Sequence, residues 1–91
     1  MIYLHNDTLR AQILPLGATL GGLWLQGAAP HSLVLGTKDG DGYDSELTYA
    51  GAVVGPVANR LRNAQANLGK DILSLPANDG NHTLHGGPDG L

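Results

Sequence analysis

Glycine and proline divide this chain into short apolar stretches, and this division restricts its possible folds more than any other feature. The 91 residues include 14 glycines and 5 prolines. No stretch keeps a 3.6-residue apolar period, and no heptad or internal repeat is present. Short apolar runs between glycine and proline turns are typical of antiparallel sheets. The sequence therefore predicts an all-β fold in one small domain.

A hairpin is predicted near the start of the chain. Asn6 and Asp7 both tolerate positive φ, and a two-residue turn at this pair places Leu4 opposite Leu9 on an apolar face. Residues 17–26 predict a further strand, bent or bulged at its paired glycines.

The strongest local pattern predicts a second hairpin, with Gly69-Lys70 as its turn. This turn places Ala66 opposite Leu73 on one face and Gln65 opposite Ser74 on the other. One face is apolar and the other mostly polar, as expected for an antiparallel pair.

Two other apolar stretches carry weaker expectations. Residues 32–35 predict a short strand that ends at a glycine. Residues 51–60 combine small and β-branched side chains with two glycines, which indicates a buried segment packed close to another backbone.

Composition excludes several classes of protein. The net charge is −3 and only five Lys and Arg are present, so no basic surface for nucleic acid is expected. No apolar run approaches the roughly 20 residues of a membrane span. The sequence also lacks cysteine and a signal-peptide pattern. We expect a cytoplasmic protein that binds neither nucleic acid nor membrane.

The polar, glycine-rich stretch 78–87 contains the first candidate site residues, His82 and His85. Two loop histidines commonly hydrogen-bond backbone groups. As a metal pair they lack further ligands at firm spacing, so no metal is expected. As groups in a sugar cleft they fit better, since histidine both donates and accepts hydrogen bonds. Gly86-Gly87 would let a ligand approach the backbone closely.

Arg60 is the second candidate, at the end of an apolar run. Arginine at a strand end is commonly an exposed cap or ion pair, but its five-donor fork can also hold two sugar hydroxyls. Asn59 beside it could orient the guanidinium. Trp24 offers either a stacking surface or core packing, and core packing is the stronger expectation. Glu46 is the only glutamate, and no paired carboxylates for acid–base chemistry are evident.

Several segments, in chain order, resemble the aldose 1-epimerase (galactose mutarotase) family. Gly-Pro-Val-Ala-Asn-Arg-Leu at 55–61 resembles the family motif Gly-Arg-x-Ala-Asn-Arg-Ile, and Leu-His-Gly-Gly at 84–87 matches a second motif. Gly-Ala-Thr-Leu at 17–20 and Leu-Val-Leu-Gly at 33–36 resemble earlier family segments. The two motifs with a hairpin between them are specific, and the resemblance covers nearly the whole chain.

The resemblance implies an antiparallel, galactose mutarotase-like β-sandwich, with residues 1–91 as an incomplete, N-terminal part of that domain. The implied reaction interconverts the α and β anomers of an aldohexose, galactose or glucose, without a cofactor. In it, a base removes the C1 hydroxyl proton while an acid protonates the ring oxygen. Carried over by motif, Arg60 and His85 contact sugar hydroxyls and Asn59 supports them.

Two departures from the family pattern change this expectation. Pro56 stands where the family usually has arginine, so one charge and one backbone donor are lost. The family's catalytic glutamate and acid histidine lie beyond the position equivalent to Leu91. We therefore expect a truncated reading frame, a gene fragment or a split piece, with no catalytic residue of its own and no activity in isolation.

Two other functions are compatible with the same residues. One is a non-catalytic carbohydrate-binding module, and the other is a small structural or interaction domain without a ligand. Exposed edges and faces of a partial sandwich also predict self-association.

Overall fold

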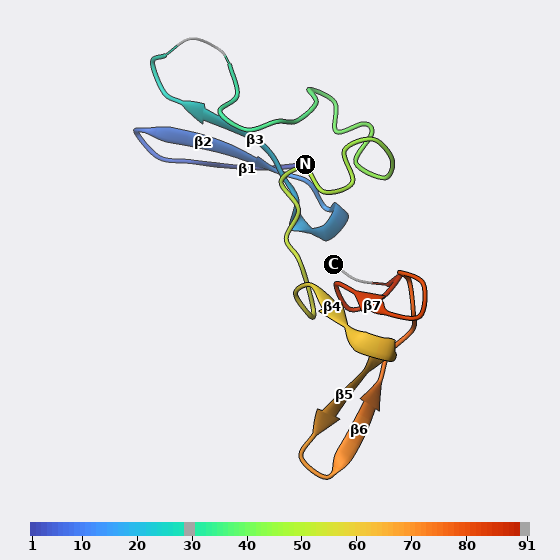
Figure 1. The fold of residues 1–91 in the computed structure, drawn as a ribbon. Coiled ribbons are helices and arrows are strands. Elements are labelled where there is room, and N and C mark those ends of the chain that lie inside the picture. Colours follow the sequence, from blue (N-terminus) through green and yellow to red (C-terminus); the bar gives the residue numbers. More distant parts are fainter. Residues whose placement is uncertain (29–30, 90–91) are drawn as a thin grey trace. The chain divides into compact units, whose positions relative to one another are not determined.

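The computed structural model describes residues 1–28 and 31–89, which form two compact units, Met1–Val53 and Val54–Leu91. Their regular elements are antiparallel strands and single turns of 3-10 helix, with no α-helix among the described residues (Figure 1). The predicted all-β, antiparallel class is confirmed. None of the described helices is long and apolar enough to cross a membrane. A single domain over residues 1–91 stays a prediction.

The first unit is built on a three-stranded antiparallel sheet in the order β1-β2-β3 (Figure 1). Its strands are β1 (Ile2–His5), β2 (Leu9–Ile13) and β3 (Leu20–Leu25), and the turn η1 (Leu16–Ala18) joins β2 to β3. Gln12 pairs with Gly22 but Ile13 pairs with Leu20, so Gly21 is an extra residue in β3. This bulge lies at the predicted glycine pair.

The first hairpin forms, but its predicted register is wrong by two residues. Leu4 pairs with Ala11 rather than with Leu9. The cause is Asn6, whose side-chain Oδ1 accepts hydrogen bonds from the backbone N–H groups of Thr8 (2.8 Å) and Leu9 (2.7 Å). These bonds widen the turn. A shift of two residues keeps every side chain on its predicted face.

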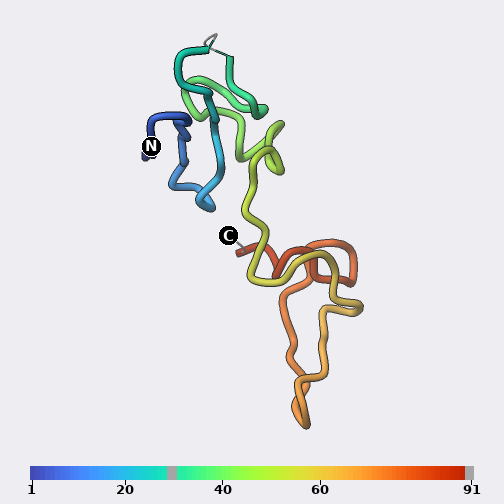
Figure 2. Tube along the Cα trace, turned by 90° about the vertical axis from the view of Figure 1, so that its left-hand side faces the viewer, coloured from blue at the N-terminus to red at the C-terminus, as the bar shows by residue number. Residues whose placement is uncertain are grey.

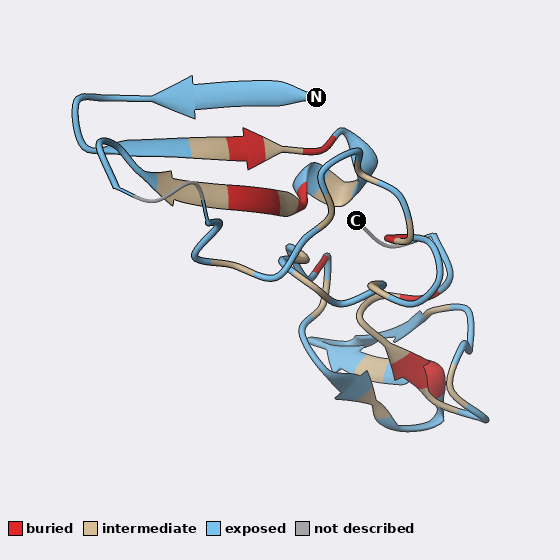
Figure 3. Ribbon diagram, turned by 90° about the horizontal axis from the view of Figure 1, so that it is seen from above, coloured by how far each residue is buried: buried red, intermediate tan, exposed pale blue. Residues whose placement is uncertain are grey.

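Burial in the first unit gathers where the bulged end of the sheet meets the following turns (Figure 3). Tyr43, from the turns at 41–51, is 4% exposed, and its hydroxyl donates to the Gly21 carbonyl at 3.4 Å. The other well-buried side chains of this unit are Gln12, Leu14 and Thr19.

The strand predicted at residues 32–35 does not form. Ser32 takes the place of a ladder partner, because its Oγ accepts the Leu23 N–H at 3.1 Å and donates to the Val34 carbonyl at 2.8 Å. One backbone bond, from Leu33 N–H to the Leu23 carbonyl, still joins this segment to β3. A side chain that bonds its own neighbourhood thus replaces the regular ladder.

The second unit contains two strand pairs. The strand β4 (Arg60–Leu61) pairs with β7 (Thr83–Leu84), and β5 (Gln65–Leu68) pairs with β6 (Asp71–Ser74). The turn η2 (Arg62–Ala64) joins β4 to β5. The β5–β6 hairpin has the predicted register, and it extends beyond the rest of this unit in both views (Figures 1 and 2).

The predicted burial of residues 51–60 is wrong for most of the segment. Val53 and Val54 are 48% and 46% exposed, and only Gly55 is buried. Residues 51–59 do not themselves form a strand, and the valines lack the packing neighbours that burial requires. The expected close approach of two backbones does occur at Gly51, whose carbonyl accepts the Leu20 N–H at 2.9 Å.

Candidate functional site

The β4–β7 pair joins the two sequence motifs of the second unit. Arg60 pairs with Leu84, and Leu61 pairs with Thr83 (Figure 1). Segments 55–61 and 84–87 therefore lie side by side although more than 20 residues separate them. Asn59, Arg60 and His85 are brought to the same end of this pair.

Asn59 and His85 exchange two hydrogen bonds just outside the ladder. The Asn59 N–H donates to His85 Nδ1 at 3.0 Å, and the His85 N–H donates to the Asn59 carbonyl at 3.0 Å. Both residues have positive φ, 62° and 54°, which turns each chain sharply out of its strand. Because Nδ1 accepts, the neutral imidazole carries its proton on Nε2.

The Arg60 guanidinium is oriented by two side chains. Its Nε donates to Asp79 Oδ2 at 2.5 Å, and its Nη1 donates to Asn59 Oδ1 at 3.4 Å. The Arg60 side chain is 54% exposed. The fork is thus positioned by neighbours while N–H donors remain on its solvent side, an arrangement suited to polar ligands.

Asp79 is a site residue that sequence reasoning did not assign to Arg60. The hydrogen bond from Arg60, and then the positive charge of Arg60, hold the pKa of Asp79 below its ordinary value. Asp79 reaches Arg60 because residues 79–82 form a tight turn, in which the backbones of Asp79 and His82 bond each other. An Asp-Gly-Asn sequence is typical of a tight turn, but it does not identify the residue that the Asp79 carboxylate meets.

His82 closes the other end of the β4–β7 pair. Its Nδ1 accepts the Asn63 N–H at 3.0 Å, and Asn63 has a φ of 54°. His82 and His85 therefore both bond backbone N–H groups, which was one of the three interpretations of this pair. No cluster of three or more potential metal-binding side chains occurs in the described part of the chain.

Asn78 and Thr83 fix the loop that leads into β7. The Asn78 carboxamide donates to the Leu84 carbonyl at 3.0 Å and accepts the Leu84 N–H at 2.7 Å, as a neighbouring strand would. Thr83 is fully buried, and its hydroxyl donates to the Pro76 carbonyl at 2.8 Å. The motif 84–87 is therefore supported from both sides.

Pro56 packs against the glycine pair that follows His85. A Cβ on Gly86 would lie 2.4 Å from Pro56 Cδ, and Gly86 has a φ of 91°. Any larger residue at position 86 would clash and would be strained. An apolar ring thus occupies the position where the family motif has arginine.

Trp24 belongs to the first unit and is half-buried rather than part of a closed core. The Arg10 guanidinium lies over its ring, 4.5 Å from the centroid. The expectation of core packing is therefore wrong, and Arg10 occupies one face of the ring.

The antiparallel β4–β7 pair brings together the two motifs that resemble the aldose 1-epimerase family. The model of the aldose 1-epimerase family matches residues 1–90. The chain belongs to the aldose 1-epimerase family, as the motifs predicted.

Individual relatives agree with this assignment. The chain is 39% identical to the aldose 1-epimerase of Haemophilus influenzae, over 96% of this chain and 26% of that protein. It is also 39% identical to the galactose mutarotase of Bos taurus, over 97% of this chain and 26% of that protein. The chain thus spans about a quarter of the length of these relatives.

Solved structures give the same result. Galactose 1-epimerase from Lactobacillus acidophilus superposes with a TM-score of 0.73 at 35% identity, over 93% of this chain and 25% of that chain. An aldose epimerase homologue from C. elegans gives a TM-score of 0.75 at 35% identity, over 98% of this chain and 28% of that chain. The expected partial coverage of the family is confirmed.

Proposed function

We propose that residues 54–89 form one wall of a sugar-binding site, and that this site serves the interconversion of α and β anomers of galactose or glucose. The observation that carries the proposal is the joint placement of Asn59, Arg60 and His85 by β4 and β7. Together they present a positioned guanidinium and an imidazole N–H. Sugar hydroxyls are recognised by such convergent donors.

In this proposal the three residues bind and orient the sugar rather than transfer protons. Arg60 and His85 donate to hydroxyls, while Asn59 holds both, through its Oδ1 to Arg60 and its backbone to His85. The base and acid of the reaction belong to the segments that complete the family's β-sandwich. The chain by itself is therefore proposed to be inactive, with no cofactor involved.

A chimera tests the binding role. Residues 1–91 would replace the matching segment of the Haemophilus influenzae enzyme, and polarimetry of freshly dissolved α-galactose and α-glucose would measure mutarotation. We expect an active chimera that loses at least about tenfold in rate with Arg60→Ala or His85→Ala, since each loses a ligand hydrogen bond. Arg62→Ala, an exposed arginine two residues away, is the matched control. Equal rates for Arg60→Ala and Arg62→Ala in an active chimera would refute the assignment.

The isolated chain distinguishes an epimerase fragment from a carbohydrate-binding module. The hydrogen bonds that assemble the cluster all lie within the second unit, and this favours binding without catalysis as the second candidate. Saturable binding of galactose without faster mutarotation would support the module. Faster mutarotation that disappears with His85→Ala would overturn the proposed inactivity.

The proposal also includes self-association of the chain through an apolar sheet face and a cytoplasmic location. The face of the β1–β2–β3 sheet that contains Leu4 is apolar and largely exposed, with Leu4 58% and Ile2 56% exposed. Exposed apolar sheet faces and open edges favour association. The cytoplasmic location rests on the cysteine-free composition, and cell fractionation would test it.

A further inference from the structure

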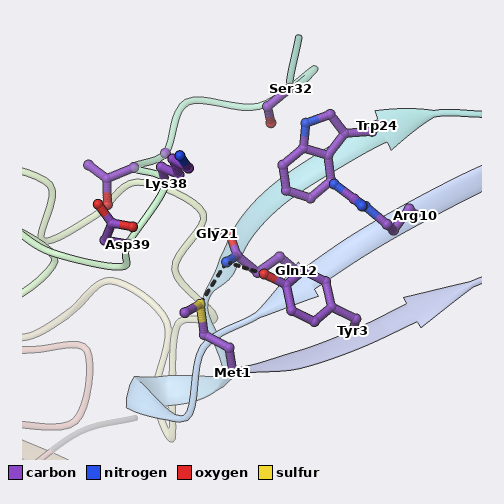
Figure 4. A pocket seen from close by; sticks show the side chains of 11 residues that line it. Met1, Tyr3, Arg10, Gln12, Gly21, Trp24, Ser32, Lys38 and Asp39 are labelled. Carbon is purple, nitrogen blue, oxygen red and sulfur yellow. Dashed lines mark hydrogen bonds between the residues drawn. The ribbon is translucent and has the colours of Figure 1, made fainter. Parts of the chain in front are cut away.

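A pocket of about 660 Å³ opens on the polar face of the β1–β2–β3 sheet (Figure 4). Its walls come only from the Met1–Val53 unit, so it does not share a residue with the Arg60–His85 cluster. Side chains of β1, β2 and β3 form the floor, and residues 36–39 form part of the rim. The volume lies within the range of small-molecule sites.

The floor is ordered by cross-strand pairing. Arg10 pairs with Trp24, and Tyr3 pairs with Gln12, so all four side chains share one face. The indole of Trp24 lies on the backbone of Gly22, where a Cβ would come within 2.1 Å of the ring. A side chain at position 22 would therefore displace the indole.

Arg10 is held by aromatic rings rather than by a carboxylate. Its Cζ lies 4.5 Å from the Trp24 ring centroid and 5.7 Å from that of Tyr3. Within the described residues the only ion pair is Arg60–Asp79, so Arg10 has no acidic partner there. Stacking uses the face of a guanidinium and leaves its N–H groups, which point outward from the edge, to meet a ligand.

Gln12 and Lys38 complete the polar character of the pocket. Gln12 is 2% exposed, and its amide donates to the Tyr3 hydroxyl at 3.1 Å, which fixes that ring. Lys38 adds a second cation to the rim, and Asp39 adds one carboxylate. The pocket therefore has an excess of positive charge although the whole chain carries −3.

We propose that this pocket binds a small dianion, inorganic phosphate or a phosphate monoester, through Arg10 and Lys38. A planar guanidinium matches two phosphate oxygens, and the Lys38 ammonium adds a second positive charge at the rim of the pocket. A sugar ring is a poorer fit, because the guanidinium already occupies one face of the indole on which a sugar would stack. This inference stands apart from the proposed sugar site and does not depend on it.

Trp24 is the only tryptophan in the chain, so its fluorescence reports on the Arg10 stack. The full chain would be titrated with potassium phosphate and with glycerol phosphate at constant ionic strength, and calorimetry would run in parallel. We expect a saturable fluorescence change with at least one of them, and the tighter ligand identifies the source. A response reproduced by potassium chloride would mean screening only and would overturn the proposal.

Variants separate the site from its surroundings. Arg10→Gln should weaken binding at least about tenfold, because a charge-assisted bond is lost. Arg10→Lys should weaken it less, because the charge stays but the fork is lost, and Lys38→Gln should also weaken it. Arg62→Gln in the second unit is the matched control and should bind normally. Calorimetric binding by Arg10→Gln equal to that of the control would also overturn the proposal.

Discussion

At the scale of single residues, Arg60 depends on partners that are distant in sequence. Asp79 is 19 positions away, yet its carboxylate meets the Arg60 Nε at 2.5 Å. Asn59, the adjacent residue, contributes the longer and weaker bond of 3.4 Å. Orientation of the guanidinium is therefore set mainly by the 79–82 turn, and the sugar-contacting role proposed for Arg60 depends on that turn.

The ion pair between Arg60 and Asp79 makes the stability of the folded chain depend on pH in a defined direction. Because the pKa of Asp79 is lowered in the folded chain, its contribution to stability is present at neutral pH and is lost as the pH falls through that lowered value. We expect Arg60→Gln to raise the pKa of Asp79 toward its ordinary value, measured by NMR titration of the carboxyl carbon. Arg62→Gln should leave the titration unchanged, and a shift of the same size in both variants would show that the pairing is not the cause.

Residue identities were predictable where a motif carried them. Asn59, Arg60 and His85 follow from two short motifs, and the structure brings them together as a cluster. The roles of Asp79, Asn78 and Asn63 could not be assigned, because they depend on which segment of the chain lies opposite each residue. That information belongs to the β4–β7 pairing, and four residues of strand are too short to leave an alternating pattern.

At the scale of elements, β4 and β7 are held by more than their own ladder. His85 bonds backbone at one end of the pair, and His82 bonds the Asn63 N–H at the other. Asn78 lines the outer edge of β7. Two-residue strands are marginal alone, so these side-chain bonds supply part of the stability of the pair.

The hydrogen bond from the Asn63 N–H to His82 can be tested directly. Replacing His82 with alanine removes the acceptor of the Asn63 N–H, which should cost about 1 kcal/mol of local stability. Hydrogen exchange measured by NMR should then be several-fold faster at Asn63, with a smaller increase at Leu61. His31→Ala, which changes an exposed histidine of the other unit, is the control. Unchanged hydrogen exchange at Asn63 would show that the His82 hydrogen bond does not stabilise this segment.

Hairpin registers were predictable where local chemistry alone decided them. Gly69-Lys70 and the alternating residues around it set the β5–β6 register correctly, since both signals lie within ten residues. The register predicted for the first hairpin is wrong because the Asn6 side chain accepts hydrogen bonds from two backbone N–H groups and widens the turn. The strand expected at 32–35 failed for a similar reason, since the Ser32 hydroxyl bonds where a ladder partner was expected.

At the scale of the whole molecule, the first unit has one sheet face with a pocket and one that is apolar. Cross-strand pairing places the apolar residues of all three strands together on the second face: Ile2, Leu4, Leu9, Ala11, Ile13, Leu23 and Leu25. Leu25 is 45% exposed, and the β1 strand is exposed throughout (Figure 3). The alternation that built this face was visible in the sequence. The sequence pattern does not show which surface would pack against this face, because that surface lies outside the local pattern.

Association through this face is the proposal that concerns the whole molecule. Covering a Leu or Ile side chain is worth about 1.5–3 kcal/mol, so a surface with several of them should drive association at moderate concentration. We expect sedimentation velocity of the full chain to show concentration-dependent association. Leu4→Lys places a charge on the exposed edge strand of this face and should shift the chain toward monomer. His5→Lys adds the same charge to the same strand but on the opposite face, and association should persist. A monodisperse monomer at all concentrations, or equal dissociation by both variants, would show that this face is not where copies of the chain meet.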